Sequence, residues 1–151
     1  MSTRIRQASA EDIGLLIGFR KKQLDDEEEH PDRNIDSELQ QWFTSVMREG
    51  KLYQLILEED GMPVATGAFL KLDMPPSFFR PEGKILYITN MYTVPSFRCR
   101  GYASEILREL KHEAENRGCE RLLLSASVWG KNVYERFGFR QSDDWMILNL
   151  K

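Results

Sequence analysis

The sequence predicts one mixed α/β domain in which helices cover the faces of a single sheet. Apolar runs typical of strands alternate with runs of helical periodicity along all 151 residues. Between residues 85 and 127 a strand, a helix and a strand follow one another. A crossover of this kind joins parallel neighbours, whereas the strands before it are expected to form antiparallel hairpins. The expected element order is β-α-α-β-β-β-α-β-α-β, within one domain spanning residues 1–151.

The first third of the chain is expected to hold one strand and two helices. A strand over residues 4–8 precedes Ser9-Ala10-Glu11-Asp12, where an acid three residues after a serine is typical of a capping box. Apolar residues then recur at helical spacing up to Leu24. The acidic run 25–29 is interpreted as the end of that helix, with a loop at His30-Pro31. The second helix has these apolar positions before Gly50 closes it: Leu39, Trp42, Phe43, Val46 and Met47.

Three strands are expected in the middle of the chain, over residues 53–58, 64–72 and 85–94. Asp60-Gly61 supplies the turn between the first two. Met74-Pro75-Pro76 breaks the pattern, so residues 78–83 are expected to be a loop. Pro95 ends the third strand, because proline has no N–H to donate to a sheet.

The last third is expected to hold two helices and two strands. A helix over residues 103–117 presents Ile106, Leu107, Leu110 and Ala114 on one face, and Gly118 ends it. A strand over 121–127, a short helix over 130–137 and a final strand over 146–150 complete the order.

Composition excludes several classes of protein. The chain is 41% hydrophobic and 30% charged, which is ordinary for a globular domain, and its net charge of −3 gives no basic field for nucleic acid. No apolar run approaches the roughly 18 residues of a membrane span, and residues 1–7 lack the apolar core of a secretory signal. Cys99 and Cys119 have neither metal-ligand spacing nor partners for a disulfide framework. We therefore expect a cytoplasmic protein with reduced thiols and no metal.

The segment Arg98-Cys99-Arg100-Gly101-Tyr102-Ala103 predicts a phosphate site, because it joins a strand to a helix through a glycine. The start of a helix has unpaired N–H groups and the positive end of the dipole, which together favour phosphate. Arg98 and Arg100 add guanidinium donors. No Gly-Lys-Ser/Thr follows, and only one glycine is present, so the two commonest nucleotide loops are excluded.

Two motifs of the chain resemble a known family. Arg98-x-x-Gly101-x-Ala103 resembles the Q/R-x-x-G-x-G/A signature of the GNAT superfamily of acyl-CoA-dependent N-acetyltransferases, and the residues 90–95 before it are similar to those of many bacterial members. Residues 133–139, Val-Tyr-Glu-Arg-Phe-Gly-Phe, resemble the family's closing motif. The chain is thus identified as a single-domain member. The resemblance implies a mostly antiparallel sheet with a central parallel pair of strands splayed around the cofactor.

The resemblance also implies acetyl-CoA as co-substrate, without a metal. Its pyrophosphate is expected on the segment 98–103 and Ser104, and its pantetheine arm on the backbone of residues 91–94. Ser127 stands where many members carry asparagine on the pantetheine, and Lys131 either reaches the cofactor or caps the last helix. The expected cofactor-binding residues are Met91, Tyr92, Thr93, Val94, Arg98, Cys99, Arg100, Gly101, Tyr102, Ala103, Ser104, Ser127 and Lys131.

Tyr134 is the residue that the closing motif implies as general acid to the departing thiolate. Phe137 and Phe139 beside it are expected to pack in the core. The strand 85–94 contains no acid, so the general base stays open among Glu58, Asp73, Tyr92 and a chain of water molecules. Asn90 either orients such a water or the substrate, or satisfies the backbone at a strand edge.

The acceptor is expected to be the amine of a small molecule or a peptide, framed by residues 23–42 and 74–83. The acidic run 25–29 could attract a cation, but such runs more often face solvent, and we favour that interpretation. Phe78, Phe79 and Trp129 either line an acceptor pocket or belong to the core. Two alternatives remain beside an enzyme, which are an acyl-CoA sensor without turnover and a domain that binds no CoA. A homodimer is suggested by the resemblance alone.

Overall fold

A computed structural model describes residues 1–27, 29 and 33–151. In these ranges the strands are β1 (Thr3–Gln7), β2 (Leu52–Glu59), β3 (Met62–Asp73), β4 (Lys84–Thr93) and β5 (Leu122–Leu124). The helices are α1 (Ile13–Asp26), α2 (Asp36–Arg48), α3 (Tyr102–Asn116) and α4 (Lys131–Phe137), with short 3-10 turns at Ala10–Asp12 and Pro95–Phe97. The loop predicted at His30 and Pro31 lies outside the described residues.

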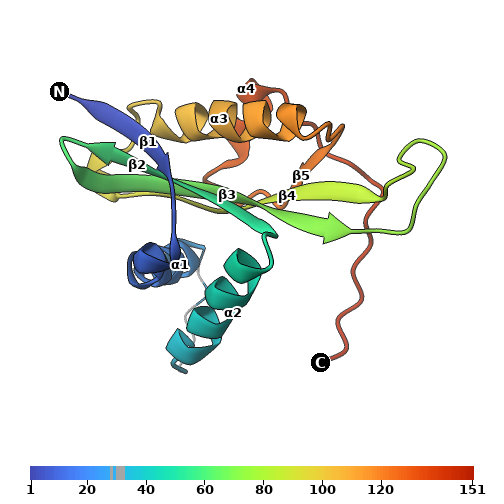
Figure 1. Cartoon of the computed structure of the whole chain (residues 1–151), viewed down its shortest axis with the longest axis horizontal. Coiled ribbons are helices and arrows are strands. Elements are labelled where there is room, and N and C mark those ends of the chain that lie inside the picture. Colours follow the sequence, from blue (N-terminus) through green and yellow to red (C-terminus); the bar gives the residue numbers. More distant parts are fainter. Residues whose placement is uncertain (28, 30–32) are drawn as a thin grey trace.

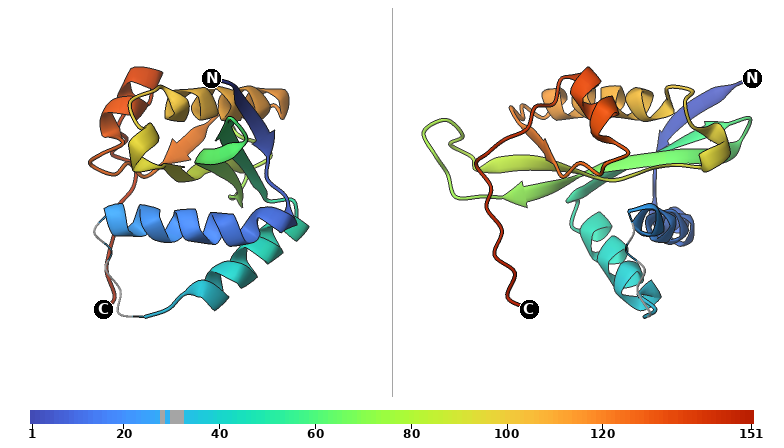
Figure 2. Two further views of the ribbon diagram at one scale, coloured as in Figure 1. Left: turned by 90° about the vertical axis from the view of Figure 1, so that its left-hand side faces the viewer. Right: turned by 180° about the vertical axis from the view of Figure 1, so that it is seen from behind.

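The strands form one sheet in the order β1-β2-β3-β4-β5, sandwiched between two helical layers (Figure 1). Neighbouring strands from β1 to β4 are antiparallel, while β4 and β5 are parallel, with Leu86 opposite Leu122 and Ile88 opposite Leu124. Helices α3 and α4 cover one face, and α1 and α2 cover the other (Figure 2). The predicted mixed α/β fold, mostly antiparallel with one parallel pair, is confirmed.

Each face of the sheet has its own apolar core. The core beneath α3 contains the predicted apolar positions of that helix, with Ile106, Leu107 and Leu110 at 0–1% exposure. Phe137 and Phe139 pack against this core, as expected. The second core lies beneath α1 and α2, where Leu16 and Phe43 are fully buried. These two cores cover both faces of the sheet with helices. A binding site is therefore expected at an end of the sheet rather than on a face.

A β-bulge in β4 opens one end of the sheet. Thr66 of β3 lies opposite Tyr92 and Ala68 lies opposite Thr89, so Gly67 alone faces the two residues Asn90 and Met91. A Cβ on Gly67 would overlap Met91 Sδ and approach Ile106 Cγ2 to 2.8 Å, so the bulge depends on the missing side chain. The β4–β5 pairing stops at Ile88, just before the bulge. The extra residue therefore turns β4 away from β5.

Two expectations about the C-terminal region are wrong. The strand predicted over 121–127 is confined to Leu122–Leu124, because β4 diverges beyond that point and offers no partner. The strand predicted over 146–150 is absent, and the side chains of Met146, Ile147, Leu148 and Leu150 are 83–95% exposed. The segment runs past the sheet toward the side of α1 and α2 (Figure 2). As a result, β5 ends the strand order, and the parallel pair lies at the edge of the described sheet rather than at its centre.

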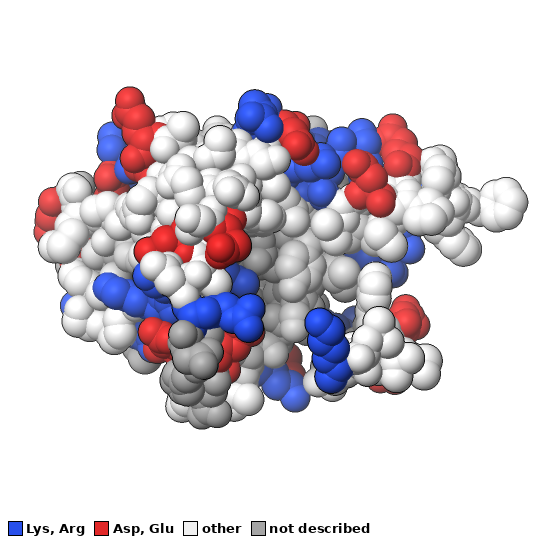
Figure 3. Space-filling view, turned by 90° about the horizontal axis from the view of Figure 1, so that it is seen from below, with Lys and Arg blue, Asp and Glu red and all other residues white. Residues whose placement is uncertain are grey.

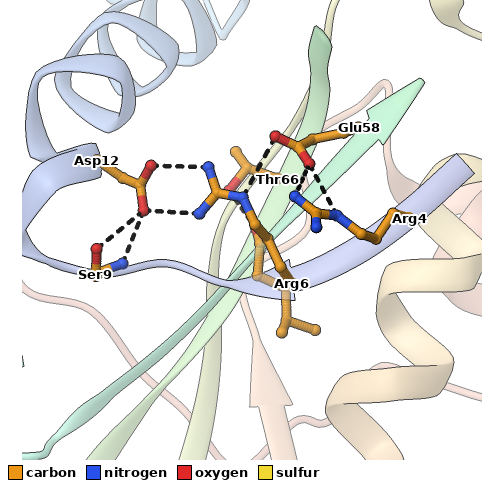
Figure 4. A network of polar contacts seen from close by, with 7 residues as sticks. Arg4, Arg6, Ser9, Asp12, Glu58 and Thr66 are labelled. Atoms are coloured by element: carbon orange, nitrogen blue, oxygen red, sulfur yellow. Dashed lines mark hydrogen bonds and ion pairs between the residues drawn. The ribbon is translucent and has the colours of Figure 1, made fainter. Parts of the chain in front are cut away.

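An ion-pair network joins β1, β2 and the 3-10 turn that precedes α1 (Figure 4). The Arg6 guanidinium donates to both carboxylate oxygens of Asp12 at 2.9 Å and to Glu58 Oε2 at 3.3 Å. Arg4 donates to Glu58 Oε1 at 2.7 Å. Asp12 also accepts the Ser9 N–H at 2.8 Å, which is the capping contact that the sequence predicts. Glu58, one of the proposed bases, is thus committed to structural ion pairs.

Replacing Asp12 with Asn is expected to reduce the free energy of unfolding at neutral pH by about 1 kcal/mol. The Arg6 hydrogen bond lowers the pKa of Asp12 to about 2. A carboxyl whose pKa is lower in the folded state stabilises the fold above its unfolded pKa of about 3.9, and the effect is lost as the pH falls toward 2. Urea unfolding at pH 7 and at acid pH should show the difference shrink. Asp73→Asn, at an exposed side chain 3.9 Å from Lys71, should change stability at neither pH.

No helix among the described residues is both long and apolar enough to cross a membrane. On the face that carries α1 and α2, Lys and Arg side chains are interspersed with Asp and Glu (Figure 3). That face therefore has no single-signed field over its surface.

Candidate active site

A cavity of about 730 Å³ lies where β4 and β5 separate. Its walls come from the end of α1, the second half of β4, the loop into α3, and the start of α4. Most of the predicted site residues line it, namely Asn90, Met91, Tyr92, Thr93, Arg98, Cys99, Gly101, Tyr102, Ala103, Ser104, Ser127 and Tyr134. Residues from both motifs thus line the same cavity, although a helix and a strand separate the two motifs in the sequence.

The loop into α3 has the backbone geometry of an anion site. Cys99 and Gly101 both have left-handed backbone angles, with φ of +63° and +83°. The Glu105 N–H is bonded to Gly101 O at 3.0 Å, so the N–H groups of Tyr102, Ala103 and Ser104 precede the first helical hydrogen bond. Among the described residues no side chain caps this helix start. The cavity is thus lined by residues of an uncapped helix start, where unpaired N–H groups and the helix dipole favour an anion.

Arg98 joins the loop to both β4 and α1. Its Nε donates to Thr93 O at 2.8 Å, and its Nη2 donates to Asp26 Oδ2 at 2.7 Å. Its guanidinium also lies 5.5 Å from the centre of the Tyr92 ring. Both partners of the ion pair are 43% exposed, so the pair contributes little stability. The pair links the end of α1 to the loop before α3, and both of its residues line the cavity.

Arg100 is turned away from the cavity. Its Nη1 donates to Glu59 Oε1 at 2.9 Å, and its guanidinium lies 4.8 Å from the Phe97 ring centre. The Tyr102 hydroxyl donates to the same Glu59 carboxylate, which is 8% exposed. Arg100 is absent from the residues that line the cavity in the described part of the chain. Its assignment to the cofactor stays a prediction, and its observed contacts are those of a structural residue.

Val94 and Lys131 also lie outside the cavity lining among the described residues. The Val94 N–H donates to Val64 O at 2.9 Å, so it is used within the sheet. Lys131 Nζ lies 3.9 Å from Glu135 on the same helix. Ser127 does line the cavity, but its Oγ accepts the Gly130 N–H at 3.1 Å, which shapes the turn into α4. Its side chain is therefore used at least in part by the turn.

Tyr134 reaches the cavity from the first turns of α4. Its ring lies against Gly130, where an added Cβ would come within 2.8 Å of the ring, and meets the Phe139 ring edge-on with centres 5.9 Å apart. Burial is the main cause that raises the pKa of Tyr134 to about 12, with the nearby charge of Glu27 adding to it. The phenol is therefore fully protonated near neutral pH, as a proton donor must be.

Asn90 sits in the bulge with a left-handed backbone angle, φ +58°, which is uncommon for a residue other than glycine. Its side chain is 5% exposed, and its Nδ2 donates to Gln54 Oε1 at 3.1 Å. It also lines the cavity. Its amide therefore bonds a side chain inside the sheet rather than the backbone at a strand edge, and its role at the cavity stays a prediction.

The candidate bases are distributed unevenly. Glu58 and Asp73 are absent from the cavity lining in the described ranges, while Tyr92 is present. Burial, followed by the charge of Asp26, raises the pKa of Tyr92, so its phenol is protonated at neutral pH and is a poor base. Among the residues that the structure describes, the carboxylates that line the cavity are Asp26 and Glu27 at the end of α1. The acidic run 25–29 was the signal in the sequence that could have identified these two carboxylates, but we interpreted that run as facing solvent.

The aromatic residues proposed for an acceptor pocket also separate. Trp129 lines the cavity at 77% exposure. Phe78 and Phe79 are 103% and 85% exposed on the β3–β4 loop, away from both the cavity and the cores. Within the described residues, no group of three or more His, Cys, Asp and Glu side chains could hold a metal ion.

Sequence comparison places the chain among acetyltransferases. A model of the acetyltransferase (GNAT) family matches residues 17–139. Thialysine N-epsilon-acetyltransferase of Mus musculus is 27% identical over 75 residues, which are 46% of this chain and 44% of the relative. Glucosamine 6-phosphate N-acetyltransferase of Trypanosoma brucei brucei is 28% identical over 79 residues, 52% of this chain and 54% of the relative. The matches thus span about half the length of these curated relatives.

Structural comparison extends the likeness to the whole chain. The crystal structure of a predicted acetyltransferase from Clostridium acetobutylicum with acetyl-CoA superposes with a TM-score of 0.94 at 39% identity, covering 99% of this chain and 97% of that one. A GCN5-related N-acetyltransferase from Ralstonia eutropha has a TM-score of 0.87 at 22% identity, covering 99% and 100%. The second likeness concerns the fold alone.

Proposed function

Because the chain belongs to the GNAT acetyltransferase family, we propose that it moves the acetyl group of acetyl-CoA to a primary amine. The observation that carries the proposal is the meeting of three features in one cavity. These are the open N-terminus of α3, the backbone of β4 freed by the bulge, and the phenol of Tyr134. An anion, an extended chain and a leaving thiolate each need one of them.

The residues of the cavity fit the parts of acetyl-CoA. The N–H groups at the start of α3 and the Arg98 guanidinium would hold the pyrophosphate. The backbone of Met91 to Thr93, beyond the last β4–β5 pair, would bond the pantetheine arm as an added strand does. An N–H of the same segment would hold the thioester oxygen as negative charge develops on it.

The transfer replaces a C–S bond with a C–N bond. Acetyl-CoA supplies the acyl carbon, the amine nitrogen attacks it, and the thiolate leaves with the bonding electrons. Tyr134 donates its proton to the sulfur and regains one from the nitrogen as the amide forms, whereas the proton that the ammonium must lose before it attacks goes to a base. Glu27 is our candidate to attract the ammonium and to receive that proton directly or through water, since Asp26 is bound to Arg98.

The acceptor is proposed to be the amine of a small molecule. The relatives named for thialysine and glucosamine 6-phosphate support this class, because both names describe small amines. The approach lies beneath the end of α1, where Arg20, Gln23 and Glu27 contribute to the cavity wall. A carboxylate at that end favours a cationic acceptor over a neutral one.

Release of free thiol from acetyl-CoA across a panel of amines tests the proposal. We expect at least one small cationic amine to accelerate release well above the rate of hydrolysis and to be recovered as its N-acetyl product. Binding of acetyl-CoA with no acceleration by any amine would favour the alternative of a sensor module. Absence of a thermal shift at saturating acetyl-CoA would contradict both, since a ligand at 100 times its Kd stabilises a protein by about 2.7 kcal/mol.

Glu27→Gln is expected to lower kcat/KM for a cationic amine at least five-fold, because it removes roughly 1 kcal/mol of attraction to the cation and also the proposed proton acceptor. The KM for acetyl-CoA should not change. Asp25→Asn is the matched control, because Asp25 is a neighbouring acid of the same helix that does not line the cavity in the described residues. An equal loss in both variants would show a general effect of charge and would remove Glu27 from the site.

A further inference from the structure

Three buried polar side chains lie beneath α1, next to the wall of the cavity. Gln54 of β2, Thr66 of β3 and Asn90 of β4 are 2%, 1% and 5% exposed. They form one chain of hydrogen bonds across three strands, from Asn90 to Gln54 at 3.1 Å and from Gln54 to Thr66 at 2.7 Å. Apolar residues would fill this position at lower cost, because buried polar groups are tolerated only when every one is bonded.

The direction of this chain is set by a backbone carbonyl. The Thr66 hydroxyl donates its single proton to Leu55 O at 2.7 Å, so its oxygen is left to accept. It therefore takes a proton from Gln54 Nε2, and Gln54 Oε1 is turned toward Asn90. That oxygen in turn accepts from Asn90 Nδ2. The oxygen and nitrogen atoms of an amide have similar shapes, so shape alone does not show which way the group is turned. Here the donors and acceptors around Gln54 and Asn90 decide the orientation of both amides.

We propose that this relay positions Asn90 so that its Oδ1 faces the cavity as a hydrogen-bond acceptor for the incoming amine. The two atoms of a carboxamide lie on opposite sides, and Nδ2 is held by Gln54 inside the sheet. Asn90 lines the cavity. In the described part of the chain every buried side-chain nitrogen or oxygen has a hydrogen-bond partner, so an Oδ1 that accepts no bond within the protein must be open to the cavity. The flipped amide would set Oδ1 against Gln54 Oε1, two acceptors without a proton between them.

A carbonyl oxygen at this point selects N–H donors. Both an ammonium and the neutral amine derived from it carry N–H bonds, so Asn90 Oδ1 can hold the nitrogen before and after it loses its proton. The bulge that carries Asn90 also frees the backbone of Met91 to Thr93 for the thioester. Gln54 and Thr66 do not line the cavity in the described residues, so they act through Asn90 as positioning residues. This inference rests on the proposed function for the identity of the ligand.

Two substitutions of Thr66 separate the relay from the packing. Thr66→Val keeps the shape and removes the hydroxyl, so the Gln54 and Asn90 amides lose their fixed direction. We expect its KM for the amine to rise about ten-fold, the effect of one lost hydrogen bond, with the Kd for acetyl-CoA unchanged. Thr66→Ser keeps the hydroxyl and should retain the amine KM of the wild type even if its melting temperature falls. The proposal would be overturned if the two variants had equal amine kinetics, or if Thr66→Val lost as much affinity for acetyl-CoA as for the amine.

Hydrogen exchange of the Asn90 side-chain amide tests the same claim without turnover. Its ¹⁵N–¹H signals are identified by their absence from the spectrum of Asn90→Asp. In the wild type we expect protection from exchange, which is lost in Thr66→Val and kept in Thr66→Ser. Exchange at the rate of an exposed amide in the wild type would overturn the inference. If no amine is a substrate while the protection holds, the proposed function fails and the orientation of Asn90 stands.

Discussion

Replacing Tyr134 with Phe is expected to lower kcat for acetyl transfer by about 10² to 10³-fold, the usual contribution of a general acid. Affinity for acetyl-CoA should stay the same, because the packing of the ring against Gly130 and Phe139 involves no hydroxyl. Tyr53→Phe is the matched control, since Tyr53 stacks on Phe69 outside the cavity lining of the described residues. A kcat for Tyr134→Phe within two-fold of the control would remove Tyr134 from the reaction.

The pH dependence of the wild type follows from the same residue. The raised pKa of about 12 means that Tyr134 keeps its proton well above the usual phenol pKa. The donor form is complete below that value and declines only as the pH approaches it. We therefore expect no loss of kcat from Tyr134 as the pH passes about 10. A decline centred there and absent from Tyr134→Phe would show that the phenol titrates near its ordinary value.

Gly67→Ala is expected to damage the site from outside it. The new Cβ would overlap Met91 Sδ and meet Ile106 Cγ2 at 2.8 Å, so β4 or α3 must shift. Overpacking of this kind costs about 1–3 kcal/mol. Because the same contact shapes the bulge, acetyl-CoA affinity should fall together with stability, which chemical denaturation and calorimetric titration would measure.

Gly18→Ala is the control for this prediction. Gly18 lies in α1 without a left-handed backbone angle, and a Cβ added there would meet no atom within 4 Å outside its own helix backbone and chain neighbours. Alanine in a helix is favoured over glycine by about 0.5–1 kcal/mol, so this variant should be neutral or more stable. If Gly67→Ala bound acetyl-CoA as well as Gly18→Ala does, the bulge would not be what opens the cofactor site.

Local patterns were enough to predict most of the fold. Strands with clear turn signals, such as the hairpin around Asp60-Gly61, and helices with an apolar face, such as α3, depend on neighbouring residues in the sequence. The sequence motifs also pointed to most of the loop 98–103 and to Tyr134 as residues of one cavity, and their roles in binding and transfer stay predictions. The structure then brought the two motifs to one cavity.

Features that depend on pairing between distant segments were not predictable. The apolar run 146–150 has the composition of a strand, but a strand needs a partner, and the described structure supplies none. Gly67 looked like any glycine in a strand, and only its position opposite Asn90 and Met91 reveals its use. Arg100 sits in the phosphate motif, yet Glu59 from a distant hairpin takes its guanidinium.

Amide hydrogen exchange with and without acetyl-CoA tests the central claim most directly, which is that the opening between β4 and β5 holds the cofactor. We predict that acetyl-CoA protects the backbone of residues 91–93 and 101–104 and leaves the β1–β2 pair unchanged. These segments carry the free strand edge and the open helix start. Protection confined to other parts of the chain, or no protection at saturating acetyl-CoA, would contradict the account.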